Sequence, residues 1–387
     1  MACNICCIWL FLSATFFLAN HHLSVCYYLK INDMKNLKQY SLFVAIIMMT
    51  ISCEKEKNGG GGPSDMHGVF IVNEGAFGQS NGDVSFMSNN GFKEITLFST
   101  ANNRPLGDVV QSMCIIGDKA YLVANNSQKI EVVSMTSFKS VGVITGLSSP
   151  RFITQINNTT AYVSDWISNS VKIIDLNTNQ VIGSINAGNG PEQMINLNSK
   201  VYVTNVGGFG KDSTVTVIDA GTNTVQTTIQ VGINPNSVIV DNTGMVWVLC
   251  GGSLGDDFTP NTADDIGGRL VKINPVSNTI VQSYDFAQGE HPLKLTTNFS
   301  KTTLYYLHGS SAYTGDVRRM SVNASSLPST AIVNREFYGL GIHPGNENIH
   351  GSIGSFSANS HALRYSSNGT LIDSMQVGIG PNGFVFN

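Results

Sequence analysis

The feature that most constrains this chain is a short pattern that repeats along it. Residues Val201 to Gly232 read VYVTNVGGFGKDSTVTVIDAGTNTVQTTIQVG, three β-rich runs separated by glycine, asparagine and threonine, with no helical periodicity. The same pattern occurs upstream at Ala161 to Gly188 and at Ala120 to Gly146. A chain of this kind is expected to build its fold from similar units packed side by side.

Seven units result when the chain is aligned on the aromatic-led strand that VYVTN represents. The leading residues are Phe70, Tyr121, Tyr162, Tyr202, Trp247, Tyr305 and, more weakly, Ile349. Repeats of roughly 40 to 58 residues, each with several strands, are typical of a β-propeller. We therefore predict an all-β fold, a seven-bladed β-propeller over residues 68–387.

The third run of a unit is followed by a strand that starts with proline. These strands read SPRFITQI, GPEQMINL, NPNSVIV, HPLKLTT and, at the last residues, GPNGFVFN. Proline suits the first residue of a strand, where its missing N–H is not needed, and we expect these strands to be innermost. The first unit starts at VFIVN with no such strand before it. GPNGFVFN is therefore predicted to pair with the first blade and close the ring without an exposed edge.

On VYVTN, TVTVIDAGTNTVQTTIQVG and NPNSVIV, the chain resembles the YVTN family of seven-bladed β-propellers. The resemblance covers nearly all of Gly68 to Asn387, and its motifs are most specific from Ala120 to Ser283. It implies a fold and little about function, because function on such scaffolds resides in the loops that they carry.

Charge and cysteine content restrict the classes of function. Charged residues make up 12% of the chain, the formal net charge is −4, and lysine and arginine are scattered, so no nucleic-acid surface is expected. Of seven cysteines, Cys114 and Cys250 fall in the repeats, and we interpret them as buried strand residues. The chain has no cysteine spacing of the metal-binding type.

The residues before the repeats have the layout of an export signal. Two lysines follow Met34 and precede an apolar run from Leu42 to Ile51, and a small residue stands directly before Cys53. The run is too short to span a bilayer comfortably. Residues 34–52 resemble a bacterial lipoprotein signal peptide, although threonine replaces the usual leucine three residues before the cysteine. The resemblance implies that Cys53 is lipidated.

Two flanking segments complete the domain organisation. Residues 1–33 are a second apolar stretch, which we interpret as an extension from a start codon assigned too early; a real membrane segment is the alternative. Residues 53–67, beginning CEKEKNGGGGP, are predicted to be a flexible lipidated tether. Cysteine followed by Glu54 resembles the export tag of lipoproteins in some Gram-negative gut bacteria. It implies an outer-membrane, cell-surface location with a lipid as the only anchor.

The turn after the aromatic-led strand varies most between units. Six of the seven turns carry one aromatic residue amid glycine, serine and asparagine: Phe77, Trp166, Phe209, Phe258, Tyr313 and Phe356. Such turns share a face with the segments that enter the innermost strands, so the aromatics are expected to ring one mouth of the channel. Variable loops commonly bind ligands, and aromatic rings give them contact area. The alternative for each ring is packing on its own blade.

The same mouth is expected to expose polar side chains near the starts of innermost strands. These are Arg104, Arg151, Glu192, Gln193, Asn236, His291, Lys294 and Asn382. Their mixed charge suits a ligand with amides and phosphate, and simple solvation is the alternative.

Catalytic and metal-binding patterns are sparse. Glu192 and His291 are candidates to converge as an acid and a base. The longest loop carries a candidate calcium site formed by Asp256, Asp257, Asp264 and Asp265. These carboxylates lack the spacing of an EF-hand, so we predict no metal and no cofactor.

Three functions are compatible with these features. We favour a non-enzymatic surface lipoprotein that binds a solute and delivers it to a TonB-dependent outer-membrane transporter. The chain is similar in architecture and address to propeller lipoproteins of gut bacteria that capture cobalamin, which implies a corrinoid ligand. The second function is a structural, adhesion or protein-interaction propeller of the cell surface, such as a surface-layer protein. The third is a propeller lyase or lactonase.

Overall fold

The computed structural model describes residues 66–256, 262–311 and 313–387, within a unit that spans Asn58–Asn387. The predicted extension, the signal peptide and the lipidation site Cys53 lie outside the described residues. In the described part, no helix combines the length and the apolar character that crossing a bilayer requires.

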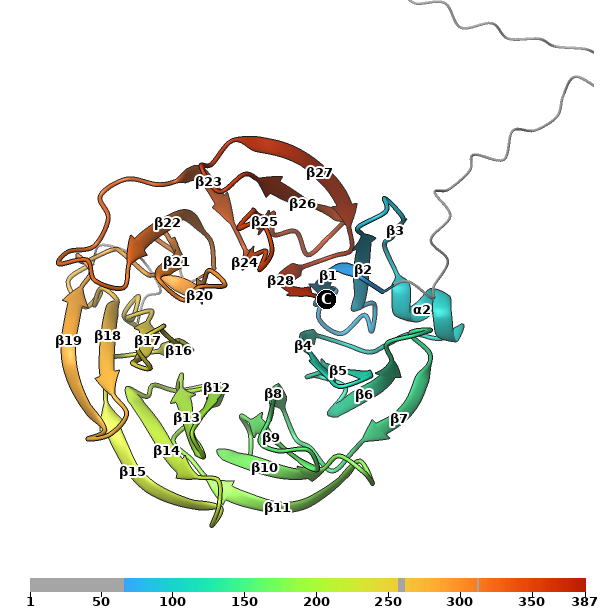
Figure 1. Cartoon of the computed structure of the whole chain (residues 1–387), viewed down its shortest axis with the longest axis horizontal. Helices are drawn as coiled ribbons and strands as arrows, with labels where there is room; N and C mark the ends of the chain where they lie inside the picture. Colours follow the sequence, from blue (N-terminus) through green and yellow to red (C-terminus); the bar gives the residue numbers. More distant parts are fainter. Residues whose placement is uncertain (1–65, 257–261, 312) are drawn as a thin grey trace, which may run out of the picture. The chain divides into compact units, whose positions relative to one another are not determined.

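The described residues form seven antiparallel, four-stranded sheets arranged as blades around a common centre, which confirms the predicted seven-bladed β-propeller (Figure 1). From the inside outward, the first blade contains β28 (Pro381–Phe386), β1 (Gly68–Asn73), β2 (Asp83–Ser88) and β3 (Lys93–Glu94). The second contains β4 (Val110–Ile116), β5 (Lys119–Ala124), β6 (Lys129–Ser134) and β7 (Ser140–Ile144). The third contains β8 (Pro150–Gln155), β9 (Thr160–Asp165), β10 (Ser170–Asp175) and β11 (Gln180–Asn186).

The remaining four blades repeat this order. The fourth contains β12 (Pro191–Leu197), β13 (Lys200–Asn205), β14 (Thr214–Asp219) and β15 (Thr224–Gln230). The fifth contains β16 (Pro235–Val240), β17 (Val246–Cys250), β18 (Arg269–Asn274) and β19 (Thr279–Asp285). The sixth contains β20 (Leu293–Thr297), β21 (Thr303–His308), β22 (Gly315–Ser321) and β23 (Val333–Phe337). The seventh contains β24 (Gly339–Ile342), β25 (Ile349–Ser352), β26 (Ser360–Tyr365) and β27 (Leu371–Val377).

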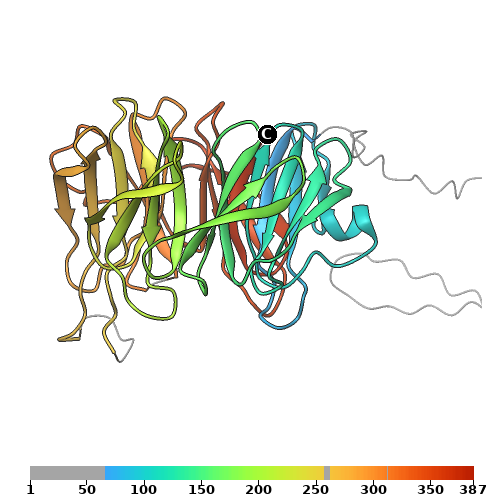
Figure 2. The same cartoon turned by 90° about the horizontal axis from the view of Figure 1, so that it is seen from below.

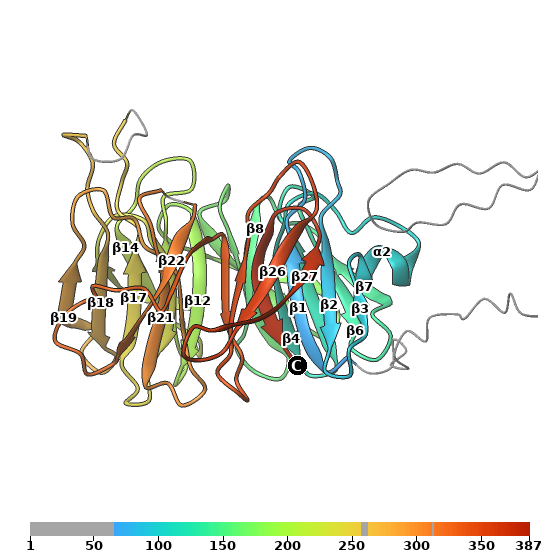
Figure 3. The same ribbon diagram turned by 90° about the horizontal axis from the view of Figure 1, so that it is seen from above.

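The first blade closes the ring as the sequence predicts. β28 pairs antiparallel with β1, with Phe70 opposite Val385 and Val69 opposite Phe386. The proline-started strands are innermost in their blades, and each innermost strand contacts those of the neighbouring blades. In the edge-on views of Figure 2 and Figure 3, the turns between strands gather on two opposite faces.

Burial follows the position of a strand within its blade. β13 is buried over five of its six residues, because its two faces pack against neighbouring blades. The outermost strand of that blade, β15, is mostly exposed and buries only Ile229. The apolar clusters therefore lie between adjacent blades, as in the cluster that joins Tyr202 of β13 to Val248 of β17.

The first blade differs from the others at its outer edge. β3 has only two residues, and a short helix, α2 (Leu97–Asn102), follows it. Leu97 and Phe98 are buried, and the Asp83 carboxylate accepts hydrogen bonds from the N–H groups of Phe98 and Ser99 at 2.9 and 3.1 Å. This carboxylate holds the first turn of α2 against the blade.

Candidate functional site

One face of the propeller collects the starts of the innermost strands and the turns after the second strands, because neighbouring strands are antiparallel. Polar and aromatic side chains from five blades meet on this face at the centre of the ring. We call this set the channel mouth; it consists of Glu74, Arg151, Trp166, Glu192, Lys294, Tyr338 and Asn382.

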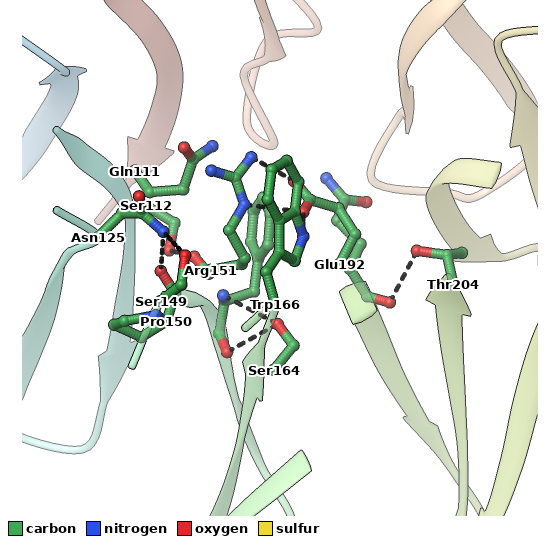
Figure 4. A network of polar contacts seen from close by, with 12 residues as sticks. Gln111, Ser112, Asn125, Ser149, Pro150, Arg151, Ser164, Trp166, Glu192 and Thr204 are labelled. Carbon is green, nitrogen blue, oxygen red and sulfur yellow. Dashed lines mark hydrogen bonds and ion pairs between the residues drawn. The ribbon is translucent and has the colours of Figure 1, made fainter. Parts of the chain in front are cut away.

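Arg151, Trp166 and Glu192 form a closed group within the mouth, which we call the Arg151 cluster (Figure 4). Arg151 donates from Nε and Nη2 to the two oxygens of Glu192, at 2.8 and 2.9 Å. The guanidinium carbon lies 3.9 Å from the centroid of the Trp166 ring, and the indole N–H donates to Glu192 Oε2 at 2.7 Å. A bidentate pair stacked on a ring is held in one geometry, so this cluster is rigid before any ligand arrives.

Local sequence positions the Arg151 cluster. Arg151 and Glu192 each follow the proline that opens an innermost strand, so they occupy equivalent positions in adjacent blades. Buried Asp165, the last residue of β9, accepts hydrogen bonds from two serine N–H groups just before β8, at 2.7 and 3.1 Å. These bonds fix the turn that carries Trp166.

Phe209 extends the aromatic surface beside this cluster. It sits at the tip of the turn after β13, is 88% exposed, and lies edge-on to Trp166 with ring centroids 6.0 Å apart. Gly207 and Gly208 in this turn have φ of 100° and 58°, which glycine adopts readily. A Cβ on Gly190 would lie 2.1 Å from the Gly208 nitrogen, so the turn packs closely against the preceding segment.

Glu74, Tyr338 and Asn382 form the second group of the mouth, which we call the Glu74 cluster. The Tyr338 hydroxyl lies 3.0 Å from each Glu74 oxygen, and Asn382 Nδ2 donates to Glu74 Oε1 at 2.6 Å. Asn382 also donates to the carbonyl of Gln111 at 2.9 Å, which joins the first blade to the second. The exposed ring of Phe356 lies edge-on to Tyr338 at 5.4 Å.

Partly buried Lys294 interacts with both clusters. Its Nζ lies 5.7 Å from the centroid of the Tyr338 ring, and its charge interacts with those of Glu74, Glu192 and Arg151. Burial lowers the pKa of Lys294 below its ordinary value, while the two glutamates act in the opposite direction. Burial and the Glu74 charge raise the pKa of the Tyr338 hydroxyl, so this phenol stays protonated and donates to the carboxylate.

The innermost strands enclose a cavity of about 190 Å³ next to the mouth. Its polar lining comes from the starts of these strands and consists of Gln111, Ser112, Gln193, Lys294 and Asn382, together with Thr296. The apolar lining includes Met113, Phe384 and Val385, together with Leu295 and Leu340, which lie as near to the starts of their strands as the polar residues do. This mixed lining suits a solute that has both polar and apolar parts.

Four of the six predicted loop aromatics are exposed. Phe77, Phe209, Tyr313 and Phe356 expose 78, 88, 68 and 49% of their surface. Trp166 is only partly exposed, because Arg151 covers its ring. Phe258 lies outside the described residues. The structure thus presents exposed aromatics on loops of four blades, and their role in binding stays a prediction.

The expectation that all eight polar residues are exposed at the mouth is wrong for four of them: three are buried, and Arg104 lies away from the innermost strands. Glu192 and Asn382 are buried because they join adjacent blades. His291 is 2% exposed, with Nδ1 2.9 Å from the Gly251 carbonyl and Nε2 3.3 Å from Asp265 Oδ1. Both ring nitrogens are therefore engaged with the fifth blade and its long loop, and the predicted convergence of His291 with Glu192 is not observed.

Arg104 does not lie among the innermost strands as expected. It pairs with Glu131 on β6, the third strand of its blade, at 2.9 Å, and its guanidinium carbon lies 4.9 Å from the Phe98 ring centroid. Asn236 and Gln193 do lie at innermost strands, and both bond to the next blade. Asn236 Nδ2 donates to the Pro292 carbonyl at 3.0 Å, and Gln193 Oε1 accepts from the Val238 N–H at 3.2 Å.

The carboxylates of the acidic loop have separate partners. Asp264 accepts hydrogen bonds from the Asp256 N–H and the Thr262 hydroxyl at 2.8 and 2.9 Å, and Asp256 pairs with Lys211 at 3.3 Å. Asp257 lies outside the described residues. Within the described part of the chain, no group of three or more His, Cys, Asp or Glu side chains is arranged to hold a metal ion.

Sequence reasoning missed Glu74, Tyr338 and Ile167 as residues of this face. Ile167 is 60% exposed in the turn that carries Trp166. Tyr338 precedes β24, which lacks the proline that marks five of the innermost strands, so no signal in the sequence indicated its position. The predicted closure could have indicated Glu74. Pairing of β28 with β1 places Asn382, on β28, beside the end of β1, and Glu74 directly follows that end.

Comparison with solved structures agrees with this architecture. The chain is similar to a quinonprotein alcohol dehydrogenase-like protein from Bacteroides thetaiotaomicron, with 15% identity and a TM-score of 0.60 over 84% of this chain and 79% of that one. It is also similar to the periplasmic gluconolactonase of Pseudomonas aeruginosa, with 12% identity and a TM-score of 0.59 over 82% and 99%. Identities this low show a shared fold alone.

Two further comparisons concern the sequence itself. No curated protein matches the chain. Residues 67–387, which hold the whole propeller, match the family model described as "Domain of unknown function (DUF5074)". The chain therefore belongs to the DUF5074 family.

Proposed function

We propose that this protein is a non-enzymatic surface lipoprotein that binds a solute at the channel mouth and passes it to a TonB-dependent outer-membrane transporter. The observation that carries the proposal is the combination of a rigid Arg151 cluster with exposed aromatic loops on the same face and a cavity of mixed polar and apolar lining. Rigid polar groups orient a ligand, and exposed rings supply contact area at a small cost in side-chain entropy.

A corrinoid is the ligand that we propose to test first. Its broad ring offers a face to Phe209 and Phe356, and its peripheral amides and phosphate are acceptors for the donors of the mouth. The cavity is too small for a whole corrinoid, so we expect the ring to lie over the mouth with one substituent inserted.

The test is calorimetry with the full chain in detergent and cyanocobalamin. We expect saturable binding that Phe209→Ala weakens and Phe299→Ala leaves unchanged. Phe299 is a matched control, because it is 76% exposed in the turn between β20 and β21, on the opposite face. Absence of binding by the wild-type protein would refute the corrinoid proposal, and titration with glycans then tests another class of solute.

The proposed address is tested separately. The N-terminal sequence supports lipidation, so Cys53→Ala should abolish labelling with a fatty-acid probe and release the protein from membranes. Continued membrane association of the variant would instead point to residues 1–33 or to an uncleaved signal as the anchor.

A lactonase is the second candidate, because the fold is shared with the Pseudomonas aeruginosa gluconolactonase. Release of acid from glucono-1,5-lactone by the full chain, lost in a channel-mouth variant such as Glu74→Ala, would favour this candidate over solute capture.

A further inference from the structure

Lys294 is held in an unusual conformation at the top of the cavity. Its φ is +59°, in the left-handed region that costs free energy for any residue except glycine. The residue is the second of β20, and its side chain lines the cavity together with Gln111, Gln193 and Asn382. Strained backbone of this kind is often retained at functional sites, where it aims a side chain.

The ammonium group of Lys294 makes no hydrogen bond or ion pair with the described residues. The two nearby carboxylates have other donors. Glu192 accepts from Arg151 and Trp166, and Glu74 accepts from Tyr338 and Asn382. A partly buried cation without an acceptor is unfavourable, so this position is suited to an acceptor supplied from outside the chain.

Arg151 adds a second cation, and one of its guanidinium nitrogens has no hydrogen-bond acceptor among the described residues. Its Nε and Nη2 bond to Glu192, while Nη1 makes no hydrogen bond with the described residues. Among the charges near Lys294, those of Glu74 and Glu192 have the larger effects and attract it, and that of Arg151 repels it. A further negative group would therefore be stabilised here by direct hydrogen bonds from the Lys294 ammonium and from Arg151 Nη1 rather than by a net positive field. Gln193 uses its Oε1 to accept from Val238, which leaves its NH₂ group as a further donor beside the cavity.

We propose that an oxyanion of the bound solute, a carboxylate or a phosphate, sits between Lys294 and Arg151 at the top of this cavity. The inference deepens the proposed solute-binding function and rests on it. Charge-assisted hydrogen bonds from an ammonium and a guanidinium are the strongest that side chains offer to such a group.

The experiment uses the full chain in detergent with inorganic phosphate and acetate as separate probes. Binding is measured by NMR titration, with ³¹P signals for phosphate and ¹³C signals for labelled acetate. The variants are Lys294→Met, Lys294→Arg and the control Lys301→Met. Lys301 is a matched control because it also has a positive φ, 55°, and lies in the exposed turn after β20 on the opposite face. Circular dichroism checks that each variant is folded.

We expect the wild-type protein to bind at least one probe, and Lys294→Met to weaken that binding by roughly ten- to a hundredfold, as loss of a hydrogen bond to a charged group typically does. Lys294→Arg and Lys301→Met should retain it. A response to one probe alone identifies phosphate or carboxylate as the group. Failure of the wild-type protein to bind either probe, or full binding by folded Lys294→Met, would overturn the inference.

The same variants separate this inference from the proposed function. If Lys294→Met binds cyanocobalamin as well as the wild-type protein does, the oxyanion site is wrong and solute capture stands. If the wild-type protein binds an oxyanion through Lys294 but no cyanocobalamin, the site is right and the corrinoid is the wrong solute.

Discussion

The Arg151 cluster and the Glu74 cluster lie at the same mouth but balance their charges differently. In the Arg151 cluster the cation and the carboxylate bond to each other, and Trp166 supplies a stacked ring and a further N–H. In the Glu74 cluster the neutral side chains of Tyr338 and Asn382 donate to the carboxylate. The nearby cation, Lys294, interacts with the charge of Glu74 but is not hydrogen-bonded to it. A site can thus combine a self-contained framework with a part whose interactions are completed by a ligand.

The largest effect should come from breaking the strand that supports the Glu74 cluster. Deletion of residues 380–387 removes β28, and with it Asn382 and the pairing that closes the first blade. We expect loss of cooperative thermal unfolding, because β1 becomes an exposed inner edge and the cavity loses one wall. Deletion of eight residues from the predicted tether, 55–62, is the control and should change little. Equal melting temperatures for the two deletions would contradict the closure.

The second prediction compares the two carboxylates directly. Glu192→Ala leaves the largely covered guanidinium of Arg151 without its partner, so we expect a loss of about 3 kcal/mol in the free energy of unfolding. Glu74→Ala removes a carboxylate held by two neutral donors, and we expect a loss nearer to 1 to 2 kcal/mol, roughly the cost of hydrogen bonds to a charged group. Urea unfolding measures both. Equal losses of unfolding free energy in the two variants would show that the different bonding of the two carboxylates does not affect stability.

The third prediction separates framework from contact surface among the aromatics. Phe209→Ala should weaken solute binding by about 1 to 3 kcal/mol, as for a large aromatic at an interface, and change stability by less than about 0.5 kcal/mol. Trp166→Ala should weaken binding and also lower stability, because its ring supports Arg151 and its N–H bonds to Glu192. Calorimetry and urea unfolding of both variants provide the test. A Trp166 variant as stable as the wild-type protein would show that the ring is not part of the framework.

The smallest effect that we expect is a pH dependence of stability and of oxyanion affinity that arises from Lys294. Its folded-state pKa is lowered, and the groups that face it are Glu74, Glu192, Arg151 and the Tyr338 ring. Between the folded and unfolded pKa values the unfolded chain binds more protons, so stability should rise with pH across that window. Affinity for an oxyanion should fall as the pH rises through the lowered pKa, because the ammonium is lost.

Lys294→Met should remove both pH dependences, and Lys301→Met should leave both in place. Stability and oxyanion affinity measured at a series of pH values between neutral and the ordinary pKa of lysine provide the check. Affinity that stays constant over this range in the wild-type protein would contradict a role for the ammonium.

The sequence was sufficient to predict the seven blades, the innermost strands that start with proline and the closure by β28, because these follow from signals that repeat along the chain. The innermost strands β4 and β24 carry no such proline. A strand that starts with proline and a strand led by an aromatic residue recur in most of the units, for the same physical reason each time. The short helix α2 was not predicted, since it occurs in one blade only and depends on the tertiary contact with Asp83.

The candidate site was predictable in its location but not in its internal arrangement. Arg151, Glu192, Lys294 and Asn382 were recognised from their position at innermost strands, yet nothing in the sequence shows which charges pair. Tyr338 bonds to Glu74 across 264 residues, and such a contact has no local signature. His291 was misjudged because a polar residue before a strand looks the same in sequence whether it faces solvent or bonds to the next loop.

Pairing of β28 with β1 also has a consequence for how the molecule is made. Asn382 and Glu74 are 308 residues apart, so the Glu74 cluster cannot form until β28 has been synthesised. Until β28 pairs with it, the apolar strand β1 has an open inner edge, the kind of surface that chaperones bind and that promotes aggregation. Pairing of β28 with β1 ends that exposure and brings Asn382 to Glu74 in the same step. A molecule with a complete Glu74 cluster has therefore already closed its ring and covered the strand edge that was most at risk of aggregation.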